Sequence, residues 1–459
     1  MGAIQVPLAD SRTSSRSVRV AATGPLWIAV PFGVLVAYDV ARVQEVVPVL
    51  DVPRLPLILG LICLVATVPS LVNGGFQALW HRSVTFRAQV GLLGLALLTM
   101  PIGIWPIGSW FYFKEKYIIQ WIVFVVGAYL FRDRRALRLV VAIFAIAVSI
   151  AAYEAVFGGA GVQKDVERVY VAASLDPNDF GAILVVTIPL VLWLVGGASG
   201  LGKLLWTAAA FLMVGAIAPT ASRGALLGIM SVALVLILVG TTGFRRIFMG
   251  GAVAIGALTF SLVVSDEQMA RFGNVGGEDD YNTNDGEGRI AIWKRGIVWT
   301  IKRPTGYGLN NFPVYFGWLN GPDRAAHNSL VQIAVELGVA GLGLFLMAFF
   351  HGIRDTQRYF SRLGGRGPPV ADARREISLA RLVLASLVGA FVTGFFLSNA
   401  YAGITMLVLA IAAGLQFGRL EPGSGQRVGP VPAMASRRRH RRAAPPGVGL
   451  PFGRVRRRA

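Results

Sequence analysis

One histidine of this chain stands where a reacting proton could be received. His327 precedes an apolar run in which Asn328, Gln332 and Glu336 follow at intervals of four residues. On a helix, this spacing places the three polar side chains on one face. Because a carboxyl group facing lipid is costly, we expect that face to line a bundle interior or a wet cavity. The neutral imidazole of His327, at the mouth of such a cavity, could accept a proton near neutral pH. The plainer interpretation is an interfacial histidine that caps a loop.

Two arginines are candidates for binding an anion. Arg223 follows the turn Pro219-Thr220-Ala221-Ser222, at the point where an apolar helix is expected to begin. A guanidinium beside a helix N-terminus adds to the positive end of the helix dipole and to its free N–H groups, and it can bind two phosphate oxygens at once. The alternative is an arginine that extends to the lipid headgroups. Arg289 provides a second cation, at the start of a predicted surface helix.

A polar cluster, Asp176-Pro177-Asn178-Asp179, precedes another apolar run. It could cap that helix or bind a sugar hydroxyl, and capping is the favoured interpretation. We therefore take Asp176 and Asn178, with Asn328 and Glu336, as candidate substrate-binding residues. A metal centre is not expected, because the chain has one cysteine, Cys63, and four histidines scattered along it.

These residues must be positioned by membrane helices. Of the 459 residues, 54% are hydrophobic and 15% are charged, and the mean hydropathy is +0.61. A soluble domain carries about 25% charged residues. An all-α integral membrane bundle of about twelve transmembrane helices is therefore expected. The expected spans are 25–41, 55–72, 88–106, 117–132, 137–157, 179–197, 202–219, 224–241, 246–265, 328–350, 378–397 and 401–418.

The basic residues predict the orientation of the bundle. The net charge of +20 lies largely in alternate short loops and in the C-terminal tail, the pattern of cytoplasmic segments rather than of a nucleic-acid-binding protein. We expect both termini in the cytoplasm and the candidate residues on the outer face. The expected organisation is a cytoplasmic segment over 1–23, nine spans within 24–265, a large outer loop over 266–326, three spans within 327–418 and a basic, disordered tail over 419–459.

The large outer loop is expected to contain an amphipathic helix. In the segment 288–299, the apolar residues Ile290, Trp293, Ile297 and Val298 recur at helical spacing. Such a helix could lie along the membrane surface or cover the helix bundle.

In these residues the chain resembles the O-antigen ligase and polymerase family of bacterial envelope glycosyltransferases. The resemblance covers about 120–420 and is strongest where His327-Asn328 leads into Glu336-Leu337-Gly338. The other matching residues are Ser222-Arg223-Gly224, Arg289, Gly306-Tyr307-Gly308 and Asn310-Asn311-Phe312.

The resemblance implies a fold of the GT-C type and a metal-independent, inverting glycosyltransferase of the cytoplasmic membrane, with no cofactor. The donor would be a glycan on undecaprenyl diphosphate, and the acceptor a hydroxyl of lipid A core, a polysaccharide or a protein. Arg223 and Arg289 would hold the diphosphate, and His327 would remove the acceptor proton. The alternative is a transporter or flippase of lipid-linked glycans. That class usually shows internal pseudo-symmetry and charges near the bilayer midplane, which we do not find in the sequence.

Overall fold

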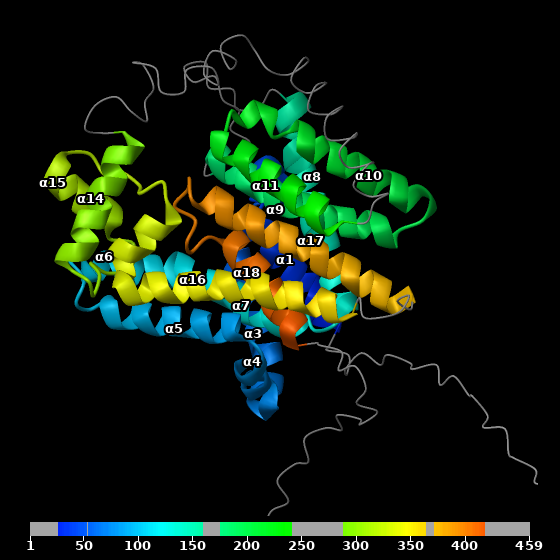
Figure 1. Ribbon diagram of the computed structural model, residues 1–459, viewed down its shortest axis with the longest axis horizontal. Coiled ribbons are helices and arrows are strands. Elements are labelled where there is room, and N and C mark those ends of the chain that lie inside the picture. Colours follow the sequence, from blue (N-terminus) through cyan, green and yellow to red (C-terminus); the bar gives the residue numbers. More distant parts are fainter. Residues whose placement is uncertain (1–25, 53, 159–174, 241–287, 364–370, 418–459) are drawn as a thin grey trace, which may run out of the picture. The chain divides into compact units, whose positions relative to one another are not determined.

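The computed structural model describes residues 26–52, 54–158, 175–240, 288–363 and 371–417 (Figure 1). Within these ranges every regular element is a helix and no strand is present, which confirms the all-α class. In chain order the elements are η1 (Leu26–Ile28), α1 (Ala29–Asp39), α2 (Val43–Val46), η2 (Pro48–Leu50), α3 (Leu55–Ser70), η3 (Leu71–Gly75), α4 (Phe76–Arg82), α5 (Val84–Thr99), α6 (Pro106–Tyr112), η4 (Phe113–Tyr117), α7 (Ile118–Leu130), α8 (Arg134–Tyr153), η5 (Glu154–Gly158), α9 (Pro177–Gly197), α10 (Gly200–Gly215), η6 (Ala218–Thr220), α11 (Arg223–Val239), α14 (Arg289–Lys302), α15 (Phe312–Asn320), α16 (Ser329–Leu363), α17 (Ala371–Gly394) and α18 (Gly403–Phe417).

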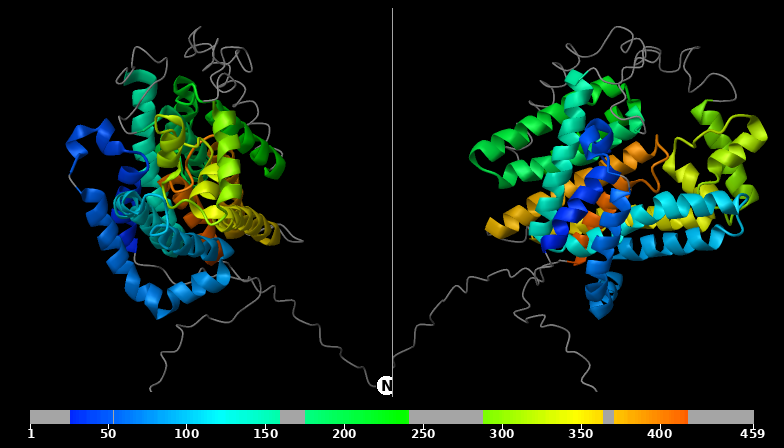
Figure 2. Two further views of the ribbon diagram at one scale, coloured as in Figure 1. Left: turned by 90° about the vertical axis from the view of Figure 1, so that its left-hand side faces the viewer. Right: turned by 180° about the vertical axis from the view of Figure 1, so that it is seen from behind.

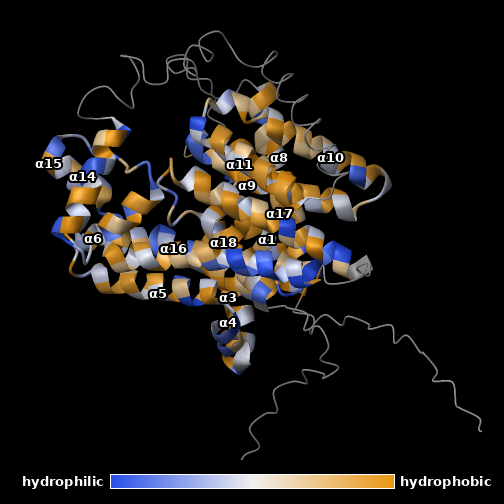
Figure 3. Ribbon diagram, viewed as in Figure 1, coloured by the Kyte–Doolittle hydropathy of each residue, from blue (hydrophilic) through white to orange (hydrophobic). Residues whose placement is uncertain are grey.

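Each expected span coincides with a helix, except the one over 246–265, which lies outside the described residues. The N-terminal segment 1–23 and the tail 419–459 lie outside them as well. Six helical stretches of the described part are long and apolar enough to cross a membrane, and shorter apolar helices accompany them. Figure 3 shows apolar residues over most of α5, α9 and α11. The chain is therefore a membrane protein, while twelve spans and the GT-C arrangement remain predictions.

Several helix boundaries differ from the expected spans. The third expected span ends early, at Thr99, and the predicted loop over 107–116 is instead helical, as α6 and η4. The charged residues of that segment favour a helix, and the ammonium of Lys114 lies 4.3 Å from the ring centre of Phe111. Helix α16 also continues to Leu363, into the predicted cytoplasmic loop.

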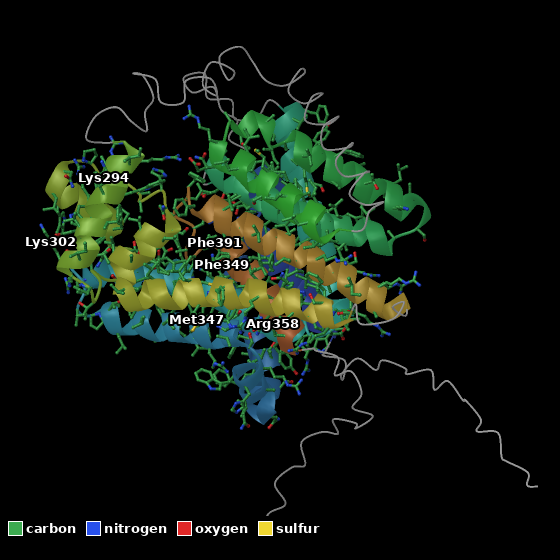
Figure 4. All side chains as sticks on the ribbon, in the orientation of Figure 1. Lys294, Lys302, Met347, Phe349, Arg358 and Phe391 are labelled. Carbon is green, nitrogen blue, oxygen red and sulfur yellow. The ribbon has the colours of Figure 1, made fainter. Side chains whose placement is uncertain are left out.

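Hydrogen bonds from small hydroxyl side chains join helices inside the bundle. Ser386 of α17 donates to the carbonyl of Val186 in α9 (2.8 Å), and Thr85 of α5 donates to the carbonyl of Ala348 in α16 (3.1 Å). Such contacts are typical of membrane helices, where a polar group has no water as an alternative partner. Phe349 of α16 and Phe391 of α17 also pack together, with ring centres 5.4 Å apart (Figure 4).

Segments that were predicted to share the cytoplasmic side meet at one end of the bundle. Arg134, at the start of α8, binds both carboxylate oxygens of Glu376 in α17, at 2.9 and 3.1 Å. The hydroxyl of Tyr359, near the end of α16, donates to the same carboxylate (3.0 Å). This half-buried cluster joins the ends of three helices far apart in sequence, as the alternating charge pattern requires.

The helices α14 and α15 lie at the other end of α16, beside α6, and α14 packs on the first part of α16 (Figures 1 and 2). The segment predicted to form an amphipathic helix is helical, as α14. Ile292, Gly296 and Trp299 are buried, whereas Ile290 and Ile297 are exposed. Gly296 allows this contact, because a Cβ there would lie 2.3 Å from Val331 of α16.

Candidate functional site

The backbone of His327 is fixed by the connection between α17 and α18. Its N–H group donates to the Oγ of Ser398 (2.9 Å). His327 adopts a left-handed conformation (φ 48°), which is uncommon for a residue other than glycine and costs about 1–3 kcal/mol. The residue is half-buried. The structure thus holds His327 in a strained position directly before α16 begins.

Ser329, two residues further on, completes this attachment. Its hydroxyl donates to the carbonyl of Leu397 (2.8 Å) and accepts from the N–H of Asn399 (2.9 Å). Between these residues, Asn328 caps α16, because its Oδ1 accepts from the N–H groups of Leu330 (2.9 Å) and Val331 (3.1 Å). The structure therefore gives Asn328 a capping role, and substrate binding by it stays a prediction.

Helix α14 reaches the same segment from the other side. Trp293 donates its indole N–H to the carbonyl of Ala326, the residue before His327 (3.0 Å). Its ring also packs edge-on against Phe395, with ring centres 5.9 Å apart. Arg289, the first residue of α14, is one helical turn before Trp293, on the same face. One helix therefore carries Arg289 and contacts the backbone beside His327.

Arg223 is the first residue of α11, as the sequence predicted. The preceding turn is closed by Ala221 in a left-handed conformation (φ 46°), and Ser222 caps the helix by accepting from the N–H of Ala225 (3.2 Å). The next residue, Gly224, packs on the α17–α18 connection, because a Cβ there would lie 3.0 Å from the Cβ of Phe396. Arg223 thus begins its helix at the same connection.

The Asp176–Asp179 cluster also reaches this connection. Asp176 caps α9 by accepting from the backbone N–H of Asn178 (2.7 Å), and its Oδ1 accepts from the Asn178 side chain as well (2.6 Å). The favoured interpretation, helix capping, is confirmed. The carboxylate of Asp179 interacts with the side chain of Asn399. Sugar binding by Asp176 and Asn178 stays a prediction.

The connection from Phe395 to Asn399 therefore joins four elements that are distant in sequence. We call it the central connection. It contacts the segment before α16, the helix α14 and the N-termini of α9 and α11. Its serine and asparagine carry no charge and separate two expected spans, so they were not among the predicted site residues. The signal that could have found it is the polar pair Ser398-Asn399 at the end where the candidate residues were predicted.

A break in α16 positions the glycine-rich loop of residues 304–308. At Gly338 the backbone leaves the helical conformation (φ 74°, ψ −173°). The carbonyls of Val335 and Glu336 then accept from the N–H groups of Tyr307 (2.8 Å) and Gly308 (2.9 Å). A Cβ at Gly338 would lie 2.1 Å from the carbonyl oxygen of Pro304, so only glycine fits.

The polar stripe on α16 is buried, as predicted. Asn328, Gln332 and Glu336 are all inside the fold, with Glu336 fully enclosed. One carboxylate oxygen of Glu336 accepts from the N–H of Phe312 (3.3 Å). The structure thus places Glu336 against the turn before α15, which it helps to hold, and a substrate role for it stays a prediction.

Tyr307 is the aromatic residue of the glycine-rich loop, and its ring centre lies 4.3 Å from that of Tyr315. Burial, with a hydrogen bond and charge interaction with the Tyr315 hydroxyl, raises the pKa of Tyr307 to about 12. The Tyr307 hydroxyl is therefore protonated at neutral pH and is unsuited to act as a general base.

Among the described residues, no group of three or more histidine, cysteine, aspartate or glutamate side chains could hold a metal ion.

A search of curated proteins finds no match to the chain. A family model described as O-antigen ligase matches residues 208–346, which run from α10 into α16 and include Arg223, Arg289 and His327. Over these residues the chain is similar to the O-antigen ligase family, and the match supports the resemblance to O-antigen ligases and polymerases.

Proposed function

We propose that this membrane protein transfers a glycan from an undecaprenyl-diphosphate donor to an acceptor hydroxyl at the outer face of the cytoplasmic membrane. The reaction inverts the configuration at the anomeric carbon and uses neither a metal ion nor a cofactor. The observation that supports it best is the central connection, around which the segments carrying His327, Arg223 and Arg289 meet. The three segments come from separate parts of the chain, and their meeting at one connection is what a shared site would need.

In the proposed reaction, His327 accepts the proton of the acceptor hydroxyl. The oxygen of that hydroxyl forms a bond to the anomeric carbon of the donor sugar as the bond from this carbon to the diphosphate breaks. The electron pair of the broken bond stays on the diphosphate oxygen. Attack and departure occur on opposite faces of the sugar, which gives inversion.

The two arginines stabilise the leaving diphosphate. Negative charge increases on its bridging oxygen as the bond breaks, and fixed guanidinium groups in a partly desolvated site favour that state. Both arginines are first residues of their helices, α11 and α14. The helix N-terminus therefore adds its own partial positive charge and N–H groups at each position.

The orientation belongs to the same proposal. The cluster of Arg134, Glu376 and Tyr359 lies near the start of α17, at the end of the bundle that we assign to the cytoplasm. The central connection follows the last residue of α17 and therefore lies at the opposite end of that helix. The site then opens toward the leaflet in which flipped lipid-linked glycans present their diphosphates. The acceptor is lipid A core, a growing polysaccharide or a protein.

The test is transfer by the purified protein in lipid nanodiscs, with a synthetic undecaprenyl-diphosphate oligosaccharide and a set of acceptors. We expect a glycosylated acceptor and free undecaprenyl diphosphate in equal amounts, with metal chelators present. Movement of the intact donor across a vesicle membrane without transfer would support the flippase alternative instead. Deletion in the source organism separates the activities: loss of attachment with free chains retained indicates a ligase, and short chains indicate a polymerase.

A further inference from the structure

Helix α14 has an apolar face that no other described part of the chain covers. Ile297 is 56% exposed and Ile301 is 72% exposed, and Ile290 and Val298 are also exposed. These residues recur at helical spacing along one side, opposite the buried Ile292, Gly296 and Trp299 face. An isolated exposed isoleucine is ordinary, but a continuous stripe of β-branched residues on a well-packed helix indicates a partner.

Exposed tryptophans are also present on the neighbouring elements α15 and α6. Trp318 of α15 is 62% exposed and Trp110 of α6 is 52% exposed, with Trp105 exposed beside it. The segment before α6 is bonded to the loop that follows α14, because the N–H of Ile104 donates to the carbonyl of Tyr307 (2.9 Å). Tryptophan with exposed apolar neighbours is the composition of a membrane–water interface.

The charges beside the stripe fit lipid phosphates. Lys294 and Lys302 are exposed on α14 (Figure 4). Lysines at this position place the ammonium group among the headgroups while their methylene stems lie on apolar surface. Helix α14 runs transverse to the long part of α16 (Figures 1 and 2).

We propose that α14, α15 and α6 form an interfacial girdle that binds anionic phospholipids of the adjacent leaflet. The exposed face of α14 enters the acyl region, and the tryptophans and lysines lie among the headgroups. The girdle is defined by Ile290, Ile297, Val298 and Ile301 of α14 with Trp105, Trp110 and Trp318. It fixes the depth of α14, and therefore of Arg289, at the level of lipid phosphates. The lipid binding itself requires no donor, acceptor or transfer step.

Spin labels measure this depth directly. Replacing the single cysteine (Cys63→Ala) gives a background for Ile297→Cys, Ile301→Cys and the control Asp323→Cys, which is exposed between α15 and α16. The nitroxide-labelled, full-length proteins are studied in nanodiscs of phosphatidylcholine and phosphatidylglycerol, without donor. We expect oxygen to relax the labels at 297 and 301 more effectively than a water-soluble nickel chelate, and the reverse at 323. Equal access of the chelate to all three positions would overturn the proposal.

Two further arms test the choice of lipid. In Lys294→Gln, Lys302→Gln protein, the difference in label depth between anionic and neutral nanodiscs should be smaller than in the parent. An unchanged difference would overturn the part assigned to the lysines. If the labels at 297 and 301 become shielded from the chelate only after undecaprenyl diphosphate is added, the stripe binds the donor and not the bilayer, which also overturns the proposal. Transfer activity enters none of these readouts, so failure here leaves the proposed function to its own test.

Discussion

The backbone N–H of His327 donates to the Oγ of Ser398, 2.9 Å away, across a separation of 71 residues. The bond joins the start of α16 to the central connection, and His327 is held in a left-handed conformation beside it. In the proposed mechanism, Ser398 is therefore a positioning residue that orients His327 toward the acceptor.

Replacing Ser398 by alanine should slow transfer by about 10- to 100-fold, because a small displacement of a reacting group is sufficient for such a loss. Ser398→Thr keeps the acceptor oxygen and should recover most of the rate. The matched control is Ser361→Ala, which removes an exposed hydroxyl at the far end of α16. Initial rates in nanodiscs measure the effect, and equal losses in the alanine and threonine variants would contradict the positioning role.

Trp293 should be needed for its indole N–H and not only for its ring. Trp293→Phe retains an aromatic ring against Phe395 but loses the hydrogen bond to the carbonyl of Ala326. We expect transfer to fall by about tenfold, corresponding to about 1.4 kcal/mol of lost transition-state stabilisation. Trp80→Phe on α4 is the control, since that indole is distant in the chain from the site. A Trp293→Phe rate equal to that of the control would refute the role of the bond.

The arginines should not tolerate lysine. Arg223→Lys and Arg289→Lys retain the charge but lose the planar fork that binds two oxygens, so each should lower transfer by about tenfold or more. Arg358→Lys, on an exposed position toward the other end of α16, is the control (Figure 4). Binding of a fluorescent donor analogue should weaken in the two site variants, and full donor binding in both would argue against diphosphate recognition.

The break in α16 should depend on the absence of a side chain at Gly338. Gly338→Ala places a Cβ against the carbonyl of Pro304 at a backbone conformation with φ 74°, and should destabilise the fold by about 2 kcal/mol or more. Gly343→Ala, an exposed position of the same helix with open space around it, should leave stability nearly unchanged. Thermal unfolding in detergent compares the two. Equal unfolding temperatures would show that the loop of residues 304–308 does not require the break.

The positions of the helices, and which helix ends lie on the same side of the bundle, were largely predictable from the sequence. Apolar length predicts a membrane helix from composition alone, and alternating basic loops predict which ends lie together, as the Arg134–Glu376 pair bears out. Arg223 and Arg289 both begin helices, as expected from the residues around them. These features depend on residues close together in the chain.

The features that the sequence did not predict depend on contacts between distant segments. The apolar residues of α14 form two stripes, and periodicity alone does not tell which one α16 buries; the position of Gly296 against Val331 decides it. The attachment of His327 to Ser398 and the insertion of residues 304–308 at Gly338 are tertiary hydrogen bonds without a local pattern. The roles of Asn328 and Asp176 as caps were more accessible, because capping follows from local spacing.

The most direct test of the central claim is the initial rate of glycan transfer by purified His327→Ala protein in nanodiscs, beside wild type and Ser361→Ala. Circular dichroism and gel filtration establish that the variant is folded. If His327 removes the acceptor proton at the central connection, the rate should fall by about 10²–10⁴-fold, while Ser361→Ala retains the wild-type rate. Transfer by folded His327→Ala at the wild-type rate would contradict the account.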